Sequence, residues 1–404
     1  LVIYINPPYA EAGTKKTMTG GGQAKSGVSF DTYVYAKYAK EISPACRELF
    51  AQFIYRIYKE INGAVIGQFS KLKIVQAHNF AAFRMMFKAR LGRSFIVPAN
   101  TFDNVSGQFP IGFFVWRTGE GASFEETTTD VYDSKSQYIG SKNISSGDKD
   151  ANVIEWLRGF YDKNGERIGY LRMNGTNVQN NSGIYLTGRL SPNDQHNHFY
   201  AEITKRNVLA MSLYNAIRQC VEATWTNDRD QYLVPNADWK DDPTFSCDCL
   251  IFSLFHGQNR ISCEHATNHW IPFVEEEVEA RECFESHFMS DFLAGKCLAQ
   301  GDSLFEGDKQ TGIVISDEAR AVLDAGCELW RYYHKQPKAN PNAAYYDIRK
   351  HFQGVTVDAK GKEKMNATSG DERYNELLAA LKSVMKKLAA KIQPKVYEYG
   401  FLKR

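Results

Sequence analysis

Residues 1–9 read Leu1-Val2-Ile3-Tyr4-Ile5-Asn6-Pro7-Pro8-Tyr9, an apolar run that ends in a double proline. Five consecutive apolar, mostly β-favouring residues predict a strand buried on both faces, as in a parallel sheet. The two prolines end this strand because neither can donate to a β-ladder. We therefore expect the turn at the carboxyl edge of a sheet, where ligands bind in α/β folds.

The rest of the first 118 residues alternates between predicted helices and strands. Apolar residues at three- and four-residue steps predict helices over residues 44–61 and 80–89. Strands are expected over residues 64–69, 94–98 and 111–116. This order is typical of half of a doubly wound sheet, with the last two strands as an antiparallel hairpin at its edge.

Beyond residue 118 the sequence becomes polar, and its short β-like runs predict a separate α+β domain over residues 119–310. The β-like runs lie at residues 126–132, 168–173, 183–186 and 249–255. Residues 311–404 predict a helical region: one helix follows an N-cap at Ser316, and another spans residues 371–392 and stops before Pro394.

Composition places the chain among globular proteins, with 404 residues, 43% apolar and 24% charged. No apolar run approaches the roughly 20 residues that cross a bilayer, so no membrane partner is expected. The eight scattered cysteines favour reduced thiols in the cytoplasm. Residues 1–118 hold 15 Lys and Arg against 6 Asp and Glu, a charge of +9, so the remainder carries −7. A basic N-terminal region favours a polyanionic partner such as nucleic acid.

The strand and turn at residues 1–9 resemble the catalytic motif of the amino-methyltransferases, which methylate exocyclic nitrogens of DNA bases. The Asn-Pro-Pro-Tyr form at residues 6–9 is typical of N6-adenine enzymes, whereas cytosine-N4 enzymes more often begin with Ser. The helix over 46–61 lies where the family's next motif helix lies. Residues 94–102, followed by 111–116, are similar to its late motif. The resemblance implies four catalytic residues, Asn6, Pro7, Pro8 and Tyr9.

The resemblance also implies the architecture and the setting of the protein. A partial doubly wound, Rossmann-like methyltransferase sheet is expected over residues 1–118, a DNA target-recognition domain over 119–310 and a helical C-terminal region over 311–404. The partner is double-stranded DNA, and the setting is the prokaryotic cytoplasm and nucleoid, within a restriction-modification system.

The expected chemistry is positioning and hydrogen bonding, without a covalent intermediate. A base amino group is a poor nucleophile because its lone pair is delocalised into the ring. Two acceptors, the Asn6 side-chain oxygen and the Pro7 carbonyl, would draw the group towards tetrahedral geometry. Tyr9 is expected to stack on the flipped base, with Phe102 as the opposite wall and Phe109 as the alternative.

S-adenosylmethionine is the methyl donor that the resemblance implies, held in the family by a glycine-rich turn and an acidic residue after two strands. Neither motif occurs before Asn6, and no convincing copy follows it. Because the chain begins at Leu1, within a strand, we expect an N-terminal truncation, with the donor half preceding the turn. This is the motif order of the γ-like class of type II enzymes. The chain as given would then be catalytically incomplete.

A loop rich in Gly, Thr, Lys and Ser follows the turn, over residues 13–27. Its composition suits a solvated linker. It suits equally well a loop that closes over a DNA phosphate backbone through Lys15, Lys16 and Lys25. The residues leave both interpretations open.

Other functions remain alternatives on the sequence alone. One is a DNA-specificity module without activity; another is a bifunctional restriction enzyme-methyltransferase, with its nuclease in a preceding segment or in a restriction subunit. Asp194 with Glu202 and Lys205 only approximates a nuclease motif, with one residue too many. Residues 6–9 also fit the Asn-Pro-x-Tyr pattern of adaptor-binding peptides, but such peptides lie in disordered tails.

A zinc site is the remaining alternative that the sequence suggests. It would use Cys247, Cys249, Cys263 and His265. The spacings differ from the usual two-residue cysteine pairs, so buried thiols are the better interpretation, and no metal is expected.

Overall fold

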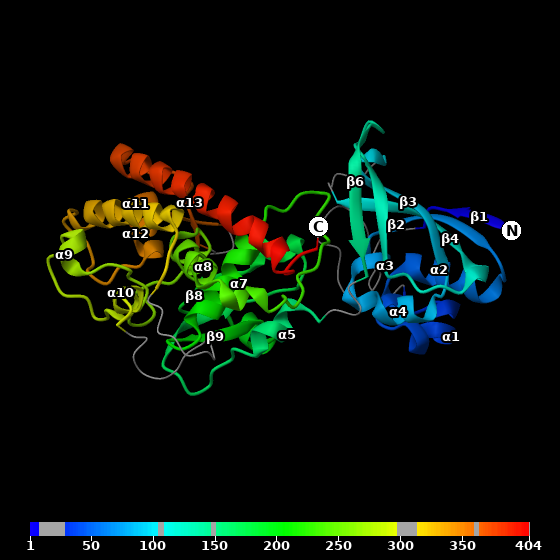
Figure 1. The fold of residues 1–404 in the computed structure, drawn as a ribbon, viewed down its shortest axis with the longest axis horizontal. Coiled ribbons are helices and arrows are strands. Elements are labelled where there is room, and N and C mark those ends of the chain that lie inside the picture. Colours follow the sequence, from blue (N-terminus) through cyan, green and yellow to red (C-terminus); the bar gives the residue numbers. More distant parts are fainter. Residues whose placement is uncertain (8–28, 104–108, 147–150, 297–312, 359–362, 404) are drawn as a thin grey trace.

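The computed structural model describes residues 1–7, 29–103, 109–146, 151–296, 313–358 and 363–403. It is a mixed α/β structure with two lobes, which lie side by side in Figure 1. Each lobe has its own large hydrophobic core, one formed by residues between 34 and 144 and the other by residues between 153 and 402. We call residues 1–146 the first lobe and residues 151–403 the second lobe.

The first lobe is built on a six-stranded mixed sheet in the order β1-β2-β4-β3-β5-β6. β1 pairs with β2 in parallel, and β3 pairs with β5 in parallel, whereas the β2–β4, β3–β4 and β5–β6 pairs are antiparallel. The six strands are β1 (Val2–Ile5), β2 (Val65–Lys71), β3 (Arg90–Pro98), β4 (Pro110–Arg117), β5 (Glu126–Tyr132) and β6 (Tyr138–Ser145).

Four helices cover one face of this sheet, below it in Figure 1. They are α1 (Tyr33–Ile42), α2 (Leu49–Glu60), α3 (Lys73–Gln76) and α4 (Ala81–Met86). α2 buries one side because Phe50, Ile54 and their neighbours recur at helical spacing, and these residues pack against Phe114 and Trp116 of β4 in one core. The helices predicted over 44–61 and 80–89 are thus confirmed in type, but both are shorter.

Two expectations for the sheet are wrong. β1 is not buried on both faces: among the described strands it pairs only with β2, and Val2 and Tyr4 are 77% and 67% exposed. The predicted β3–β4 hairpin is antiparallel as expected, but it lies inside the sheet, because β5 pairs with the other side of β3. The sheet therefore continues across the predicted boundary at 118/119.

The second lobe holds a four-stranded sheet in the order β10-β8-β7-β9, surrounded by helices. Its strands are β7 (Arg167–Arg172), β8 (Tyr185–Thr187), β9 (Tyr200–Thr204) and β10 (Asn259–Arg260), and a separate pair consists of β11 (Val355–Val357) and β12 (Glu363–Met365). Its helices are α5 (Val153–Arg158), α6 (Pro192–His196), α7 (Val208–Gln219), α8 (Pro243–Phe255), α9 (Glu275–Val278), α10 (Phe288–Leu293), α11 (Asp317–His334), α12 (Tyr345–Gln353) and α13 (Glu372–Glu398).

The C-terminal helices share the core of the second lobe. Ser316 caps α11 as predicted, accepting a hydrogen bond from the backbone N–H of Ala319 at 3.2 Å. α11 packs on both α8 and α13, so residues 153–293 and 313–403 are not separated at the predicted boundary at 310/311.

Two predicted elements of the second lobe are wrong. Residues 249–255 belong to helix α8 rather than to a strand. α13 does not stop before Pro394 but continues to Glu398, and Ile392 and Val396 on either side of the proline are buried. A proline removes one helical hydrogen bond, and tertiary packing on both sides outweighs that loss.

Candidate functional site

Strand direction brings the predicted base-holding residues to one edge of the large sheet. β1, β2 and β3 all run in the same direction, so their carboxyl ends lie at the same edge, where β4 begins. Because Ile5 pairs with Gln68, Asn6 comes level with Phe69. Pro98 pairs with Pro110 at the same edge, and Phe102 and Phe109 lie just beyond these two prolines.

Aromatic rings gather beside this edge, on the sheet face opposite the helices. The Phe69 ring lies 5.2 Å from that of Phe102 and 4.9 Å from that of Phe113, measured between centroids. The backbone N–H of Ala99 donates to the carbonyl of Phe109 at 2.8 Å, which ties the turn after β3 to the start of β4. Phe102 and Phe109 both pack, half-buried, on one small apolar cluster.

The turn itself is described only at its first two residues. Asn6 is exposed and Pro7 is buried, so the end of β1 is anchored by the proline while the asparagine side chain reaches the surface. Pro8, Tyr9, Lys15, Lys16 and Lys25 lie outside the described residues. Asn6, Phe102 and Phe109 lie at the same edge of the sheet, and their roles in holding a base stay predictions.

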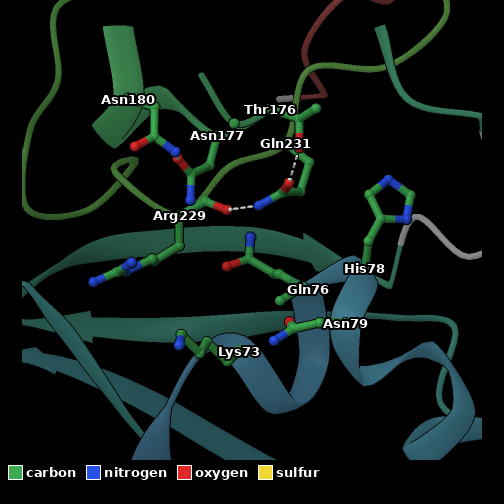
Figure 2. Close-up of a pocket in the computed structure, with 11 residues that line it drawn as sticks. Lys73, Gln76, His78, Asn79, Thr176, Asn177, Asn180, Arg229 and Gln231 are labelled. Atoms are coloured by element: carbon green, nitrogen blue, oxygen red, sulfur yellow. Dashed lines mark hydrogen bonds between the residues drawn. The ribbon is translucent and has the colours of Figure 1, made fainter. Parts of the chain in front are cut away.

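A polar cavity of about 210 Å³ lies between the two lobes. Figure 2 shows that the first lobe contributes α3 and the turn after it, whereas the second lobe contributes two loops. The lining residues are Lys73, Gln76, Ala77, His78 and Asn79 from the first lobe and Gly175, Thr176, Asn177, Asn180, Arg229 and Gln231 from the second. Because α3 directly follows β2, this cavity opens near the same carboxyl edge.

Two buried arginines shape the walls of this cavity. On the first lobe, Arg84 donates to the carbonyls of Ile74 at 3.0 Å and Ala77 at 2.8 Å, which fixes the chain where α3 ends. On the second lobe, Arg218 donates to the carbonyls of Gly175 at 3.2 Å and Asn177 at 3.0 Å. Both walls are therefore held by side-chain donors that satisfy backbone carbonyls.

Asp230, which is half-buried, joins the two lobes beside the cavity. Asp230 accepts hydrogen bonds from Gln76 Nε2 at 3.0 Å and from Lys142 Nζ at 2.7 Å. Burial raises the pKa of Asp230, although Lys142 and Gln76 act in the opposite direction. Trp225 adds an apolar contact to the core of the first lobe. Among the described residues, Asp230 therefore links the lobes through the Lys142 ion pair and the Gln76 hydrogen bond, and Trp225 lies nearby in the sequence.

The neighbouring Asp228 has a pKa raised to about 6, chiefly because it is buried. Its Oδ1 has no hydrogen-bond partner among the described residues, and Arg229 Nε lies 3.6 Å from Oδ2. Since the folded state holds the proton more tightly than the unfolded chain, the resulting stability is present below pH 4 and is lost as the pH rises through about 6.

We therefore expect Asp228→Asn to stabilise the protein more at pH 7.5 than at pH 4.5. The gain at pH 7.5 should be about 3 kcal/mol at most, because the pKa of Asp228 is raised from 3.8 to about 6. Chemical denaturation at the two pH values measures it, with Asp133→Asn on the exposed β5–β6 turn as a control for the loss of one charge. A gain of equal size at both pH values would contradict the raised pKa of the buried Asp228 carboxyl group.

The cavity was not predicted from the sequence. The residues of the zinc alternative form no ligand group among the described residues. The first wall follows a strand at a carboxyl edge, which is a usable signal, but nothing in the sequence points to the loops at 175–180 and 229–231. Cys247 and Cys249 are buried in α8, and the described residues contain no group of three potential metal ligands.

Two further findings concern membrane spans and similarity to known proteins. Within the described ranges, no helix is long and apolar enough to cross a membrane. When the sequence is compared with known proteins, no family model and no curated protein matches it.

Proposed function

We propose that this chain is the base-holding and DNA-recognition part of a site-specific DNA methyltransferase that acts on adenine N6. The position of Asn6 and Pro7 carries the proposal. They end a parallel strand at the carboxyl edge of a six-stranded mixed sheet, level with Phe69 and near Phe102. Such an edge is where α/β folds bind their ligands.

The two lobes match the other parts that this function requires, a methyltransferase-like sheet and a DNA-recognition region. The first lobe has helices between successive parallel strands on one face, which is compatible with a Rossmann-like fold. The second lobe contacts α3 and β6 of the first lobe, because Asp230 accepts hydrogen bonds from Gln76 and Lys142. In the proposed arrangement, the second lobe reads the DNA sequence and the edge of the first lobe holds the base.

The residues of the edge suit the recognition of a base amino group. The side chain of Asn6, an exposed residue, contains a carboxamide oxygen, and the buried Pro7 that follows it contributes a backbone carbonyl. Both are acceptors for the two hydrogens of the amino group. Phe102 offers a half-buried ring at this edge, supported by Phe69, and a flipped base gains stability by stacking on such a ring.

S-adenosylmethionine is the donor that this activity requires, and it supplies the transferred methyl group when bound. The described residues at the carboxyl edge do not fit it. β2 is followed by Leu72 and Lys73, β3 by Ala99, and β5 by the hairpin turn at Asp133. None of these turns is rich in glycine, so no step is assigned to the donor here.

The proposal predicts a defined product. The full-length natural protein, incubated with methyl-labelled S-adenosylmethionine and DNA of random sequence, should yield N6-methyladenine when the DNA is digested to nucleosides. N4-methylcytosine instead would overturn the choice of base. DNA binding without any methylated base would favour a specificity module, acting with a separate subunit in a restriction-modification system of a prokaryotic cell.

A further inference from the structure

The cavity between the lobes is separate from the proposed base-holding edge. None of Asn6, Phe102 and Phe109 lines it. Its two walls come from different lobes, and nearly all its side chains carry hydrogen-bonding groups, as Figure 2 shows. Its volume of about 210 Å³ suits a ligand of nucleobase size with part of a sugar.

The floor of the cavity presents a buried acceptor with a fixed direction. Gln76 is only 6% exposed, and its Nε2 donates to Asp230 at 3.0 Å, which sets the orientation of the amide. Among the described residues, Gln76 Oε1 accepts no hydrogen bond, and His78 Nε2 has no hydrogen-bond partner. A buried acceptor without a donor is unfavourable, so the floor of the cavity favours a ligand that brings an N–H group.

The remaining walls favour a ligand with several hydrogen-bonding edges and little net charge. Side-chain amides of Asn79, Asn177, Asn180 and Gln231 surround the cavity, and amides are the side chains that pair with base edges. Of the two cationic side chains, Lys73 also contacts Glu48. Arg229 donates to Gln179 at 2.5 Å and lies near Asp228.

Arg229 is the group best placed to take an anionic part of the ligand. Its guanidinium lies at one side of the cavity, away from His78 (Figure 2). Since Asp228 has a pKa of about 6, part of its opposing charge is lost in mildly acidic solution. A planar guanidinium can bind a phosphate by two hydrogen bonds or stack on a base.

We propose that this cavity binds one nucleotide whose base carries an exocyclic amino group. The amino group donates to Gln76 Oε1, and the phosphate binds Arg229. The same chemistry comes from a free mononucleotide or from one nucleotide of a DNA strand. The proposal stands on the cavity alone and does not need the methyltransferase activity.

Calorimetric titration of the whole chain at pH 7.5 tests this proposal with two matched ligands. Deoxyadenosine monophosphate should bind at least about tenfold more tightly than thymidine monophosphate, which has no exocyclic amino group. Inorganic phosphate binding as tightly as the nucleotide would overturn the role of the base. Equal affinity for the two nucleotides would overturn the role of Gln76.

One variant tests the wall that holds the phosphate. Arg229→Gln should weaken binding of the adenine nucleotide about tenfold. Arg189→Gln, which changes an exposed arginine outside the cavity, should leave affinity unchanged. Thermal unfolding confirms that each variant is folded.

The same assay distinguishes a free mononucleotide from a nucleotide within a DNA strand. If only a short single-stranded oligonucleotide binds, and Arg229→Gln weakens it, the cavity takes a nucleotide within a strand. If neither ligand binds, or if Arg229→Gln and Arg189→Gln behave alike, the proposal is wrong. Asn6→Ala should not alter mononucleotide affinity, so failure of this site is distinguishable from failure of the proposed function.

Discussion

Asn6→Ala is expected to reduce methyl transfer by the full-length protein at least about a hundredfold while leaving DNA affinity nearly unchanged. The side chain is exposed at the end of β1 and takes no part in a hydrophobic core, so its removal should leave the fold intact. In the proposed mechanism, the variant loses an acceptor for the hydrogens of the reacting amino group. Removing one oriented hydrogen-bonding group from a catalytic site typically costs about 10²–10³ in rate.

A control variant and a DNA-affinity measurement test this prediction. Asn164→Ala removes an equally exposed carboxamide from the second lobe and should leave methyl transfer unchanged. Filter binding or fluorescence anisotropy gives the DNA affinity of each variant. If Asn6→Ala loses affinity and activity by the same factor, the asparagine binds DNA rather than activating the base.

Short elements with a clear period were predictable from the sequence. Residues 126–132 alternate between exposed and buried side chains, and the predicted strand coincides with β5. Ser316 precedes two acidic residues, and the cap it forms on α11 was predictable because its hydrogen bond is local. These signals lie within one or two turns of chain, so no distant contact decides them.

The errors arose where a distant contact decides the outcome. α8 is buried on all sides, so residues 249–255 form an apolar run, interrupted only by Ser253, that periodicity cannot distinguish from a central strand. A different ambiguity applies to the apolar residues 1–5, because β1 within them lies at an edge of the described sheet. Whether a strand is central or at an edge depends on its neighbours, which the run itself does not encode.

The candidate site divides in the same way. The position of Asn6 at a strand end was predicted from the apolar run and the prolines that follow it. Phe102 and Phe109 were proposed from the resemblance to the methyltransferase late motif, and both lie at the same edge as Asn6. The cavity between the lobes was not predicted. Its walls lie about a hundred residues apart in the sequence, and their meeting depends on Asp230 reaching Gln76 and Lys142.

The second wall of that cavity depends on one fully buried cation. Arg218 is 0% exposed, and its guanidinium donates to Asn181 Oδ1 at 2.8 Å besides the carbonyls of Gly175 and Asn177. It also lies over the Tyr232 ring, 4.5 Å from the centroid. The backbone from Gly175 onward therefore takes its path because a planar donor with several N–H groups satisfies it.

Arg218→Met should destabilise the second lobe by about 3–5 kcal/mol. Methionine fills similar space and removes the cost of burying a charge, but four acceptors then lose their donor: the Asn181 side chain, the Tyr214 hydroxyl and the carbonyls of Gly175 and Asn177. Each lost hydrogen bond to a buried acceptor costs about 1–3 kcal/mol, so the loss outweighs the gain from removing the buried charge. Arg218→Lys should be intermediate, because a single ammonium group cannot reach all four acceptors.

Urea denaturation followed by tryptophan fluorescence measures the change, with Arg189→Met as the control for loss of an exposed arginine. Nucleotide affinity provides a second measurement. Because Asn177 and Asn180 belong to the segment that Arg218 holds, Arg218→Met should also weaken nucleotide binding under conditions where the variant is still folded. A variant as stable as the parent protein would mean that the carbonyls find other donors, and the wall would then not depend on this arginine.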